Sequence, residues 1–338
     1  MAKMRSRGTG LPTLAEVAAK AGVSPITASR ALRAVPSVDP DLVERVRKAA
    51  KLLGYVPNPA ARTLASARSR SVMVLIPALT NQLFIEMFEM IEQVLSARGF
   101  EALMGHYHYD QAEEERLIRN YLAYQPCGIL VTGFGQSEVS ARLLADCGLP
   151  RIHMMELAET ADVASVGFSQ EAAGAAVARH LIERGRRHFA FFGAQLDRRL
   201  LQRRDGFQRA LVEAGFPPAL EIMTPEPSSI ALGAAQFSAL RQTDPGIDAI
   251  FFCNDDLAFG ASFEALRQGV RVPETIAFVG FNDLPGADQI LPRLTSVRTP
   301  RAEIGRCAAL RLLALIEGEK PADTRLDLGF ELIVRDSS

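Results

Sequence analysis

Residues 22–33 read GVSPITASRALR and bring hydroxyl, guanidinium and small apolar side chains to one face of a short helix. Hydroxyl and guanidinium groups donate hydrogen bonds to phosphates and base edges, and exposed apolar side chains contact thymine methyl groups. This combination predicts a nucleic-acid-binding face rather than an ordinary solvated helix. The residues on the predicted outer side are Ser24, Pro25, Ile26, Thr27, Ser29, Arg30 and Arg33.

Cap signals on both sides of this stretch predict two helices joined by a short turn. Thr13 and Glu16 have the spacing of a capping box, in which each side chain satisfies a free backbone N–H. Gly22 then ends the first helix in the left-handed conformation, and Ser24 caps the second helix, with Pro25 at its first position. The residues expected to face inward are Ala28, Ala31 and Leu32.

A third helix follows, because Asp39 and Pro40 repeat the cap-then-proline signal and Gly54 supplies the stop. Three short helices within residues 12–58 predict a helix-turn-helix module whose second helix enters the major groove of DNA. A generic small helical bundle is the alternative that the helix pattern alone leaves open. The apolar positions of the third helix are Val43, Val46, Ala50 and Leu53.

Charge is divided unevenly along the 338 residues, whose net charge is −1. Residues 1–70 hold 13 Lys and Arg against 4 Asp and Glu, whereas residues 71–338 hold 25 against 35. A basic N-terminal part, which begins with an expected disordered tail at 1–11, suits a polyanion such as DNA. A solvated basic tail would have the same charge, so the pattern of residues must decide.

Residues 59–70 are predicted to form a hinge rather than a stable helix. Pro57 and Pro59 interrupt the preceding helix, and AARTLASA provides only about two turns, which are marginal in isolation. Such a segment becomes helical when DNA and a second copy of the chain support it, and Leu64 is then a candidate wedge in the minor groove. A flexible basic linker is the alternative.

From residue 71 onward the pattern changes to apolar strands separated by amphipathic helices. This alternation predicts an α/β core of two doubly wound lobes with parallel sheets, joined to the all-α headpiece. Ligands of such sheets bind outside the carboxyl ends of the strands, where polar residues collect in this chain. The strand segments are SVMVLIPAL, FEALMGHYH, GILVTGF, RIHMME, FAFFGA, AIFFCND and IAFVGFND.

Several other classes of protein lack their sequence signatures here. The chain has no run of about 18 apolar residues and no apolar segment after its basic start, so we expect a cytoplasmic protein. No P-loop, G-x-S-x-G or complete G-x-G-x-x-G occurs, and we expect neither an enzyme nor a bound cofactor. Its four cysteines stand far apart, which speaks against a zinc site or a disulfide framework and predicts buried small residues. His106 and His108 lack a third ligand at a recognisable spacing, so no metal site is predicted.

Five long motifs occur in a fixed order: TLAEVAAKAGVSPITASRALR, LGYVPNPAARTLAS, HLIERGRRHFAFFG, CNDDLAFGASFEALRQGVRVPETIAFVGFND and PRLTSVRTP. Over nearly its whole length the chain therefore resembles the LacI/GalR family of repressors. LTNQLFIE, HYHYD and LDLGFEL are most similar to the gluconate-operon repressors of that family. The resemblance implies a headpiece at 12–58, a hinge at 59–70 and a periplasmic-binding-protein-like core at 71–338 for effector binding and dimerisation. The N-lobe is expected at about 71–169 and 298–326, and the C-lobe at about 170–297 and 327–338.

The resemblance also implies a homodimer that binds a pseudo-palindromic operator. Residues of the second helix would read the major groove, and Leu64 of the hinge matches the position that intercalates. The C-terminus ELIVRDSS carries no leucine heptads, so a dimer is expected rather than a tetramer. The expected DNA contacts are Thr13, Ser24, Pro25, Ile26, Thr27, Ser29, Arg30, Arg33, Asn58, Ala61, Arg62, Leu64 and Ala65.

The same resemblance implies a small-molecule effector in the core. Arg203 matches the family arginine of R-x-x-G-F, Asn254 lies in CNDD, and Asn282 stands where many members carry Asp. A neutral amide at that position removes repulsion against an anionic ligand, so that Arg203 pairs with a carboxylate while amides bind hydroxyls. The expected pocket residues are Asn81, Phe84, His106, Arg203, Asn254 and Asn282.

These residues predict a repressor of sugar-acid catabolic genes that a gluconate-type effector releases from its operator. 2-Ketogluconate or another sugar is the alternative effector. The alternative response is co-repression, in which the effector strengthens operator binding. A sugar-binding transport protein with the same kind of core is the remaining alternative.

Overall fold

The computed structural model describes residues 11–33, 35–56, 69–79, 82–160, 162–319 and 323–338. The chain divides into two compact units, Met1–Ser69 and Arg70–Ser338, here called the headpiece and the core. Within the described ranges, no helix combines the length and the apolar content that crossing a bilayer requires.

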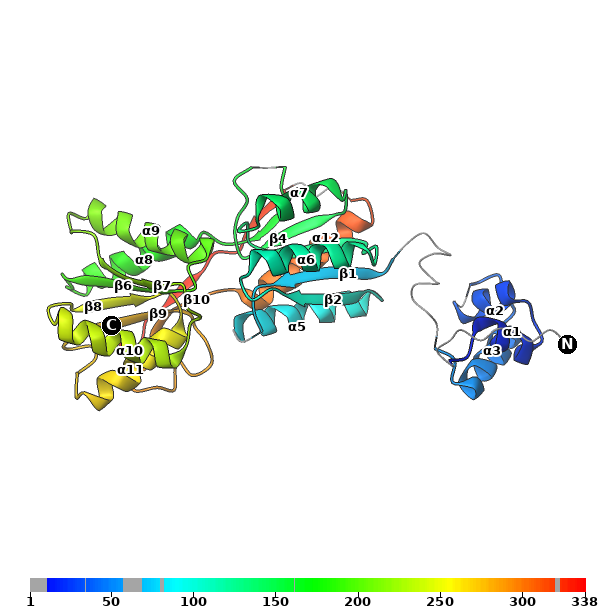
Figure 1. Cartoon of the computed structure of the whole chain (residues 1–338), viewed down its shortest axis with the longest axis horizontal. Helices are drawn as coiled ribbons and strands as arrows, with labels where there is room; N and C mark the ends of the chain where they lie inside the picture. The colour runs from blue at the N-terminus through cyan, green and yellow to red at the C-terminus, as the bar shows by residue number, and fades with distance from the viewer. Residues whose placement is uncertain (1–10, 34, 57–68, 80–81, 161, 320–322) are drawn as a thin grey trace. The chain divides into compact units, whose positions relative to one another are not determined.

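The helices of the headpiece begin at the capping signals that the sequence predicts. Thr13 and Glu16 close the capping box, in which the Thr13 amide donates to the Glu16 carboxylate at 2.6 Å. Ser24 caps the second helix, Asp39 caps the third, and Gly22 is left-handed with φ 65°. These helices, blue in Figure 1, are α1 (Leu14–Ala21), α2 (Pro25–Leu32) and α3 (Pro40–Leu53).

Alanines allow the three helices to pack around one small core. Ala28 and Ala31 of α2 are fully buried and share a cluster with Val17 of α1 and Val46 of α3. Their predicted inward orientation is confirmed, although Leu32 is only half-buried. Since the inner face of α2 is used for packing, its opposite face is left to solvent.

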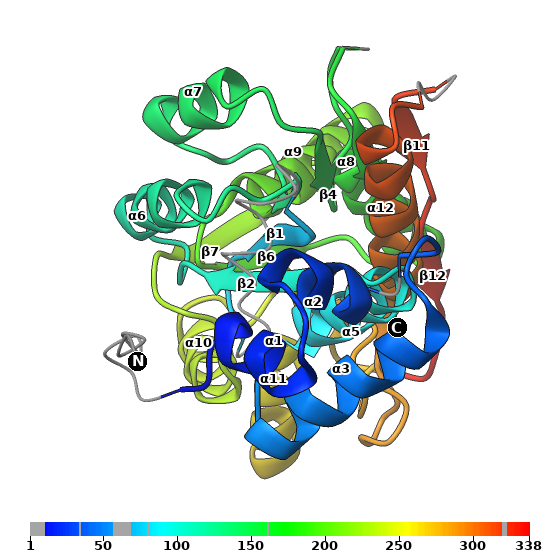
Figure 2. The same ribbon diagram turned by 90° about the vertical axis from the view of Figure 1, so that its right-hand side faces the viewer.

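The first lobe of the core is a parallel sheet with the strand order β11-β5-β4-β3-β1-β2. Figure 2 shows α6 and α7 on one side of this sheet and α12 on the other. The strands are β1 (Ser71–Ile76), β2 (Glu101–His106), β3 (Gly128–Thr132), β4 (Arg151–Met154), β5 (Ser165–Gly167) and β11 (Arg325–Asp327), and the helices are α5 (Gln82–Ala97), α6 (Gln111–Leu122), α7 (Glu138–Asp146) and α12 (Arg301–Ile316).

Alternation along β1 explains how one strand serves both helix layers. Val72 and Val74 belong to the cluster that includes Met87 of α5, whereas Met73 and Leu75 belong to the cluster beneath α6 and α7. Successive side chains of a strand point to opposite faces, so a continuous apolar run is required when both faces are covered.

The second lobe is a sheet with the order β12-β10-β9-β8-β6-β7, in which β10 and β12 are antiparallel and the other pairs are parallel. Figure 1 shows α8 and α9 on one face and α10 and α11 on the other. The strands are β6 (Phe189–Ala194), β7 (Leu220–Thr224), β8 (Ala249–Phe252), β9 (Ala277–Asn282), β10 (Thr295–Arg298) and β12 (Glu331–Ile333), and the helices are α8 (Gln170–Glu183), α9 (Arg198–Glu213), α10 (Ile230–Thr243) and α11 (Asp255–Arg267).

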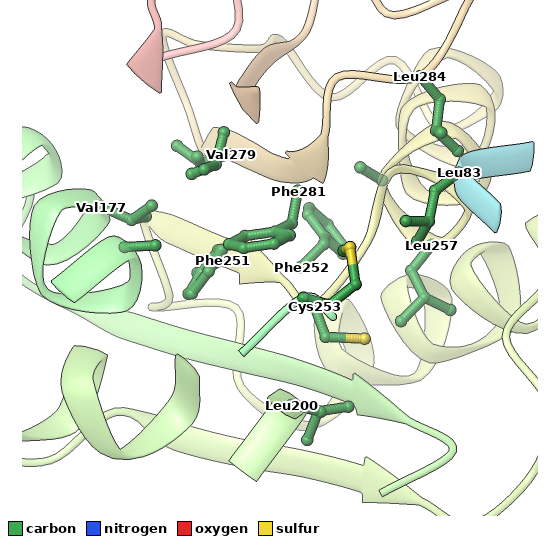
Figure 3. Close-up of a cluster of buried hydrophobic side chains, with 14 of the residues drawn as sticks. Leu83, Val177, Leu200, Phe251, Phe252, Cys253, Leu257, Val279, Phe281 and Leu284 are labelled. Atoms are coloured by element: carbon green, nitrogen blue, oxygen red, sulfur yellow. The ribbon is translucent and has the colours of Figure 1, made fainter. Parts of the chain in front are cut away.

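Phenylalanine rings fill both faces of this second sheet. Phe251 contacts Phe207 of α9 at a centroid distance of 5.2 Å, and its neighbour Phe252 contacts Phe278 at 5.2 Å on the other face. Figure 3 shows Phe281 beside Phe251, near the end of β9. The aromatic layer therefore fixes the strand ends from which the polar residues of the core project.

Paired glycines bring α8 and α9 into close contact. A Cβ atom at Gly174 would overlap the carbonyl oxygen of Arg203, and one at Gly206 would overlap that of Glu171. Because only glycine permits this approach, the position of Arg203 is set by the helix crossing as well as by its own helix.

Five short strands escape the sequence pattern, namely β5, β7, β10, β11 and β12. Several lie at or next to sheet edges and contain polar residues, as in Arg-Leu-Asp of β11, so no apolar run marks them. The predicted fold class is confirmed, with the correction that one strand pair is antiparallel. The lobe boundaries stay a prediction. Strand β10, which ends at Arg298, pairs with β9 in the second sheet.

The cysteines are free, but only Cys253 is buried. Cys127, Cys147 and Cys307 are partly exposed, so the prediction of four buried residues is wrong for three of them. Cys127 precedes β3 and Cys147 follows α7, whereas Cys307 lies within α12.

Candidate functional site

The outer face of α2 exposes the side chains that the sequence analysis selects. Ile26 is 69% exposed, and Pro25, Arg30 and Arg33 are also exposed. One exposed apolar side chain is ordinary on a protein surface, but an apolar and two cationic side chains on one helix face are suited to contact with DNA.

Two hydroxyls of the same face contribute to the helix start. The Ser24 and Thr27 hydroxyl oxygens lie 2.8 Å apart, and the Thr27 amide donates to the Ser24 hydroxyl at 3.1 Å. Ser24 is exposed and Thr27 and Ser29 are half-buried, so all three border the exposed face. Thr13 is the N-cap residue of α1, and its hydroxyl donates to the Glu16 carboxylate at 3.0 Å.

The remaining predicted DNA contacts, Asn58, Ala61, Arg62, Leu64 and Ala65, lie outside the described residues, and so does the predicted pocket residue Asn81. Their roles stay predictions.

A small cavity lies between the two lobes of the core and has about 40 Å³ of free space. Phe84 of the first lobe lines it together with Arg203, Asn254 and Asn282 of the second lobe. Four predicted pocket residues, from distant parts of the sequence, are therefore brought together at the carboxyl ends of strands. His106 is not in the wall of this cavity and instead contacts the ring of His108 at 4.4 Å.

Arg203 is half-buried, and its guanidinium is held in a defined orientation. Its Nη1 donates to the Cys253 carbonyl oxygen at 2.5 Å, and its guanidinium lies 4.0 Å from the ring centroid of Phe281. Burial lowers the pKa of Arg203, which nevertheless stays charged because an arginine titrates far above neutral pH. Its Nε is buried without a hydrogen-bond partner among the described residues.

Arg199 lies one helical turn before Arg203 and faces the same cavity. It pairs with Asp197 and lies over the ring of Phe84 at 5.5 Å. Burial alone would raise the pKa of Asp197, but the nearby guanidiniums of Arg199 and Arg203 lower it below its ordinary value. The pair is therefore ionised, and the positive charge of Arg203 is left over for a ligand.

Both asparagines of the cavity have a structural task. The Asn254 side-chain oxygen caps α11 and accepts from the Ser228 hydroxyl at 2.8 Å. Asn282 is 3% exposed and has φ 102°, a conformation that asparagine adopts more readily than most residues. Its carbonyl oxygen accepts from Nη1 of Arg301 at 2.6 Å, which holds the turn after β9.

Comparison with known proteins places both units in one family. The model described as "Bacterial regulatory proteins, lacI family" matches residues 13–58, and that described as "Periplasmic binding protein-like domain" matches residues 178–338. The HTH-type transcriptional regulator GntR of Pseudomonas aeruginosa is 58% identical over 334 residues, which cover 98% of this chain and 97% of the relative. The chain belongs to the LacI family.

Solved structures of LacI-family regulators match the same architecture. Transcription regulator GntR from Chromobacterium violaceum is 48% identical with a TM-score of 0.77, covering 79% of this chain and 99% of that one. A LacI-family protein from Silicibacter pomeroyi is 32% identical with a TM-score of 0.90, covering 96% of this chain and 99% of that one. The chain is therefore a transcriptional regulator and not an enzyme.

Several residues of this LacI-family cavity escape the sequence reasoning. Tyr109, Gln195, Asp197 and Arg199 line it beside the predicted residues. Arg199 carried a usable signal, since it stands four residues before Arg203 and so shares its helix face. Tyr109 carried none, because its direction depends on the left-handed backbone of His108 and Tyr109 after β2.

The LacI-family core has no group of three or more metal-binding side chains within the residues that the structure describes. The cavity offers instead one guanidinium without a carboxylate partner, four side-chain amides and aromatic walls. This set of groups is suited to an oxygen-rich anion.

Proposed function

We propose that this LacI-family chain is a homodimeric repressor that binds a pseudo-palindromic operator and is released from it by a sugar acid of the gluconate type. The observation that carries the effector class is Arg203, a half-buried arginine that lines the cavity with no carboxylate partner among the described residues. A ligand carboxylate would supply that partner.

The DNA-binding part of the proposal is supported by the exposed outer face of α2. In a helix-turn-helix unit the second helix enters the major groove with its N-terminal residues at base edges. Ile26 is suited to thymine methyl groups, and Arg30 is suited to phosphate or guanine. A lac repressor dimer has been solved bound to operator, and this chain has the same fold at 23% identity. DNA binding also implies a cytoplasmic location.

The hydroxyl groups of a sugar acid suit the remaining polar groups. Asn254 and Asn282 offer amides at the cavity wall, and Tyr109 offers a phenol. Because Asn282 adds no negative charge beside Arg203, the site favours an anion over a neutral sugar. Gluconate and 2-ketogluconate share the carboxylate and most hydroxyls, so both belong to the proposed class.

The position of the cavity between the lobes supports coupling of effector binding to DNA binding. Phe84 belongs to the first lobe and Arg203 to the second, so a ligand that contacts both stabilises one arrangement of the lobes. A ligand that weakens operator binding must itself bind less tightly in the presence of operator, by the same factor.

Titration calorimetry with the full-length protein tests the proposal. Gluconate, 2-ketogluconate and glucose are titrated into the protein alone and into its complex with an operator selected from random duplex DNA. We expect both acids to bind, glucose to bind at least tenfold more weakly, and operator to reduce acid affinity. Binding of glucose with failure of both acids would overturn the effector class, and equal affinity with and without operator would overturn the coupling.

A further inference from the structure

A second, larger cavity adjoins the one that holds Arg203 and has about 380 Å³ of free space. The two cavities share wall residues, including Tyr109, Asp197 and Arg199. The second cavity, here called the side chamber, extends to Tyr107 and to Glu114 of α6. Its volume lies within the range of about 300–1,000 Å³ that small-molecule sites occupy.

Three buried side chains around the side chamber have polar atoms without hydrogen-bond partners among the described residues. They are Glu114 Oε1, Glu156 Oε1 and Arg199 Nη1, and their residues are only 1%, 3% and 6% exposed. Glu156 Oε1 lies 3.3 Å from Arg198 Nε, an ion pair whose geometry is too poor for a hydrogen bond. Buried polar atoms normally bond to protein, ordered water or a ligand, so three of them on one cavity make it suited to the polar groups of a ligand.

The charge of the side chamber excludes the anionic end of such a ligand. Glu114, Glu156 and Asp197 contribute carboxyl groups, against the two guanidiniums of Arg198 and Arg199. Asp197 is already paired with Arg199, and Arg198 is paired with Glu156 and Glu159. Among the described residues, each guanidinium of the side chamber therefore already has a carboxylate partner, whereas Arg203 of the neighbouring cavity has none.

Glu114 differs from the other carboxyl groups because it has no cationic partner among the described residues. Burial raises the pKa of Glu114 to about 7, so near neutral pH it occurs in both protonation states. Either state makes hydrogen bonds to a hydroxyl group, which both donates and accepts. Tyr107 lies nearby with a buried phenol, which completes a surface suited to neutral hydroxyl groups.

We propose that the side chamber binds the hydroxylated carbon chain of the effector, with Glu114 bonded to a hydroxyl remote from the ligand carboxylate. This inference rests on the proposed function, since it requires a carboxylate at Arg203. The remote hydroxyl is then the part of the ligand that decides selectivity among sugar acids. A site built to bond a hydroxyl rejects an analogue that lacks it, because the buried protein groups are then left unpaired.

The test compares gluconate with glycerate, a three-carbon acid that keeps the carboxylate and the two nearest hydroxyls. Calorimetry uses the full-length protein, its Glu114→Leu variant and a matched Glu115→Leu control on the same helix, where Glu115 pairs with Arg119 outside the side chamber. We expect wild-type protein to bind gluconate at least 100-fold more tightly than glycerate. Glu114→Leu should weaken gluconate at least tenfold and leave glycerate unchanged, while Glu115→Leu changes neither.

Two outcomes separate this inference from the proposed function. If wild-type protein binds gluconate but Glu114→Leu leaves the gluconate-to-glycerate ratio unchanged, the side chamber is not the chain site, although the repressor proposal stands. If wild-type protein binds neither acid, both proposals fail. Should Glu114→Leu not fold, Tyr107→Phe, which removes only a hydroxyl, gives the deciding ratio.

Discussion

Arg199 and Arg203 lie one turn apart on α9 and face the same cavity, but only Arg199 has a carboxylate partner, Asp197. The first guanidinium is therefore part of the wall, and the second is available to an anion. Their environments, rather than their residue type, separate the two roles.

Replacing Arg203 with lysine tests the second of these roles. Lysine keeps the charge but loses the planar fork and the contact with Phe281, so we expect gluconate affinity to fall roughly 10- to 100-fold. Arg204→Lys is the matched control, because Arg204 pairs with Asp205 at 2.6 Å on an adjacent position of the helix. Calorimetry provides the readout, and equal losses in both variants would contradict the assignment.

Asn282→Asp examines the charge argument directly. Aspartate tolerates positive φ nearly as well as asparagine, so the turn after β9 is expected to be retained. A second carboxylate in the cavity should repel the ligand anion and reduce sugar-acid affinity at least tenfold, with a smaller effect on neutral sugars. Unchanged affinity for the acids in calorimetry would show that Asn282 does not face the ligand carboxylate.

Substitutions on α2 should separate base reading from phosphate binding. Ile26→Ala is expected to change which operator sequences are selected from a random library, because it removes an apolar base contact. Arg30→Ala, if its guanidinium binds phosphate, should weaken all sequences alike and reduce the salt dependence of binding. Lys48→Ala on α3, where Lys48 lies 3.8 Å from Glu44, is the control. An Ile26→Ala variant with unaltered affinity and preference would remove α2's outer face from the interface.

Glu114 should make the stability of the core depend on pH. Burial raises its folded-state pKa to about 7, above the ordinary value of 4.5, so folding favours the protonated form. The associated stability is complete below about pH 4.5 and is lost as pH rises through about 7. Glu114→Gln should therefore raise the thermal midpoint relative to wild type at pH 8 but not at pH 4.5, equivalent to at most about 3 kcal/mol.

The control for this prediction is Glu115→Gln, which changes a half-exposed carboxylate beside Arg119. Differential scanning calorimetry at the two pH values measures both variants. If the thermal midpoint of Glu114→Gln equals that of wild type at both pH values, the pKa of Glu114 is not raised in the folded protein.

Local capping signals predicted the helices of the headpiece, whereas the short edge strands of the core depend on long-range packing and were not predicted. Thr13, Ser24 and Asp39 each cap the expected helix, because a cap depends on residues within one turn. Short edge strands such as β11 and β12 depend on pairing with distant strands, so their few polar residues gave no signal.

The cavity was predictable where a residue is fixed to a regular element and unpredictable at turns. Arg203, Asn254 and Asn282 come from a helix face or a strand end, and all three line the cavity. His106 was expected there because the sequence places it at the carboxyl end of the second strand, which is where β2 does end. The strand ends at His106 and the backbone turns left-handed at His108 and Tyr109, so Tyr109 reaches the cavity instead.

Arg301, the first residue of α12 in the first lobe, bonds to the turn that contains Asn282 in the second lobe. Its Nη1 bonds to the Asn282 carbonyl oxygen at 2.6 Å, and its Nε bonds to Glu86 of α5 at 2.5 Å. Any movement of that turn away from α5 must lengthen one of these two bonds. These two bonds therefore stabilise the lobe arrangement seen in the structure, and a ligand that favours another arrangement must compensate for the bond that is lost.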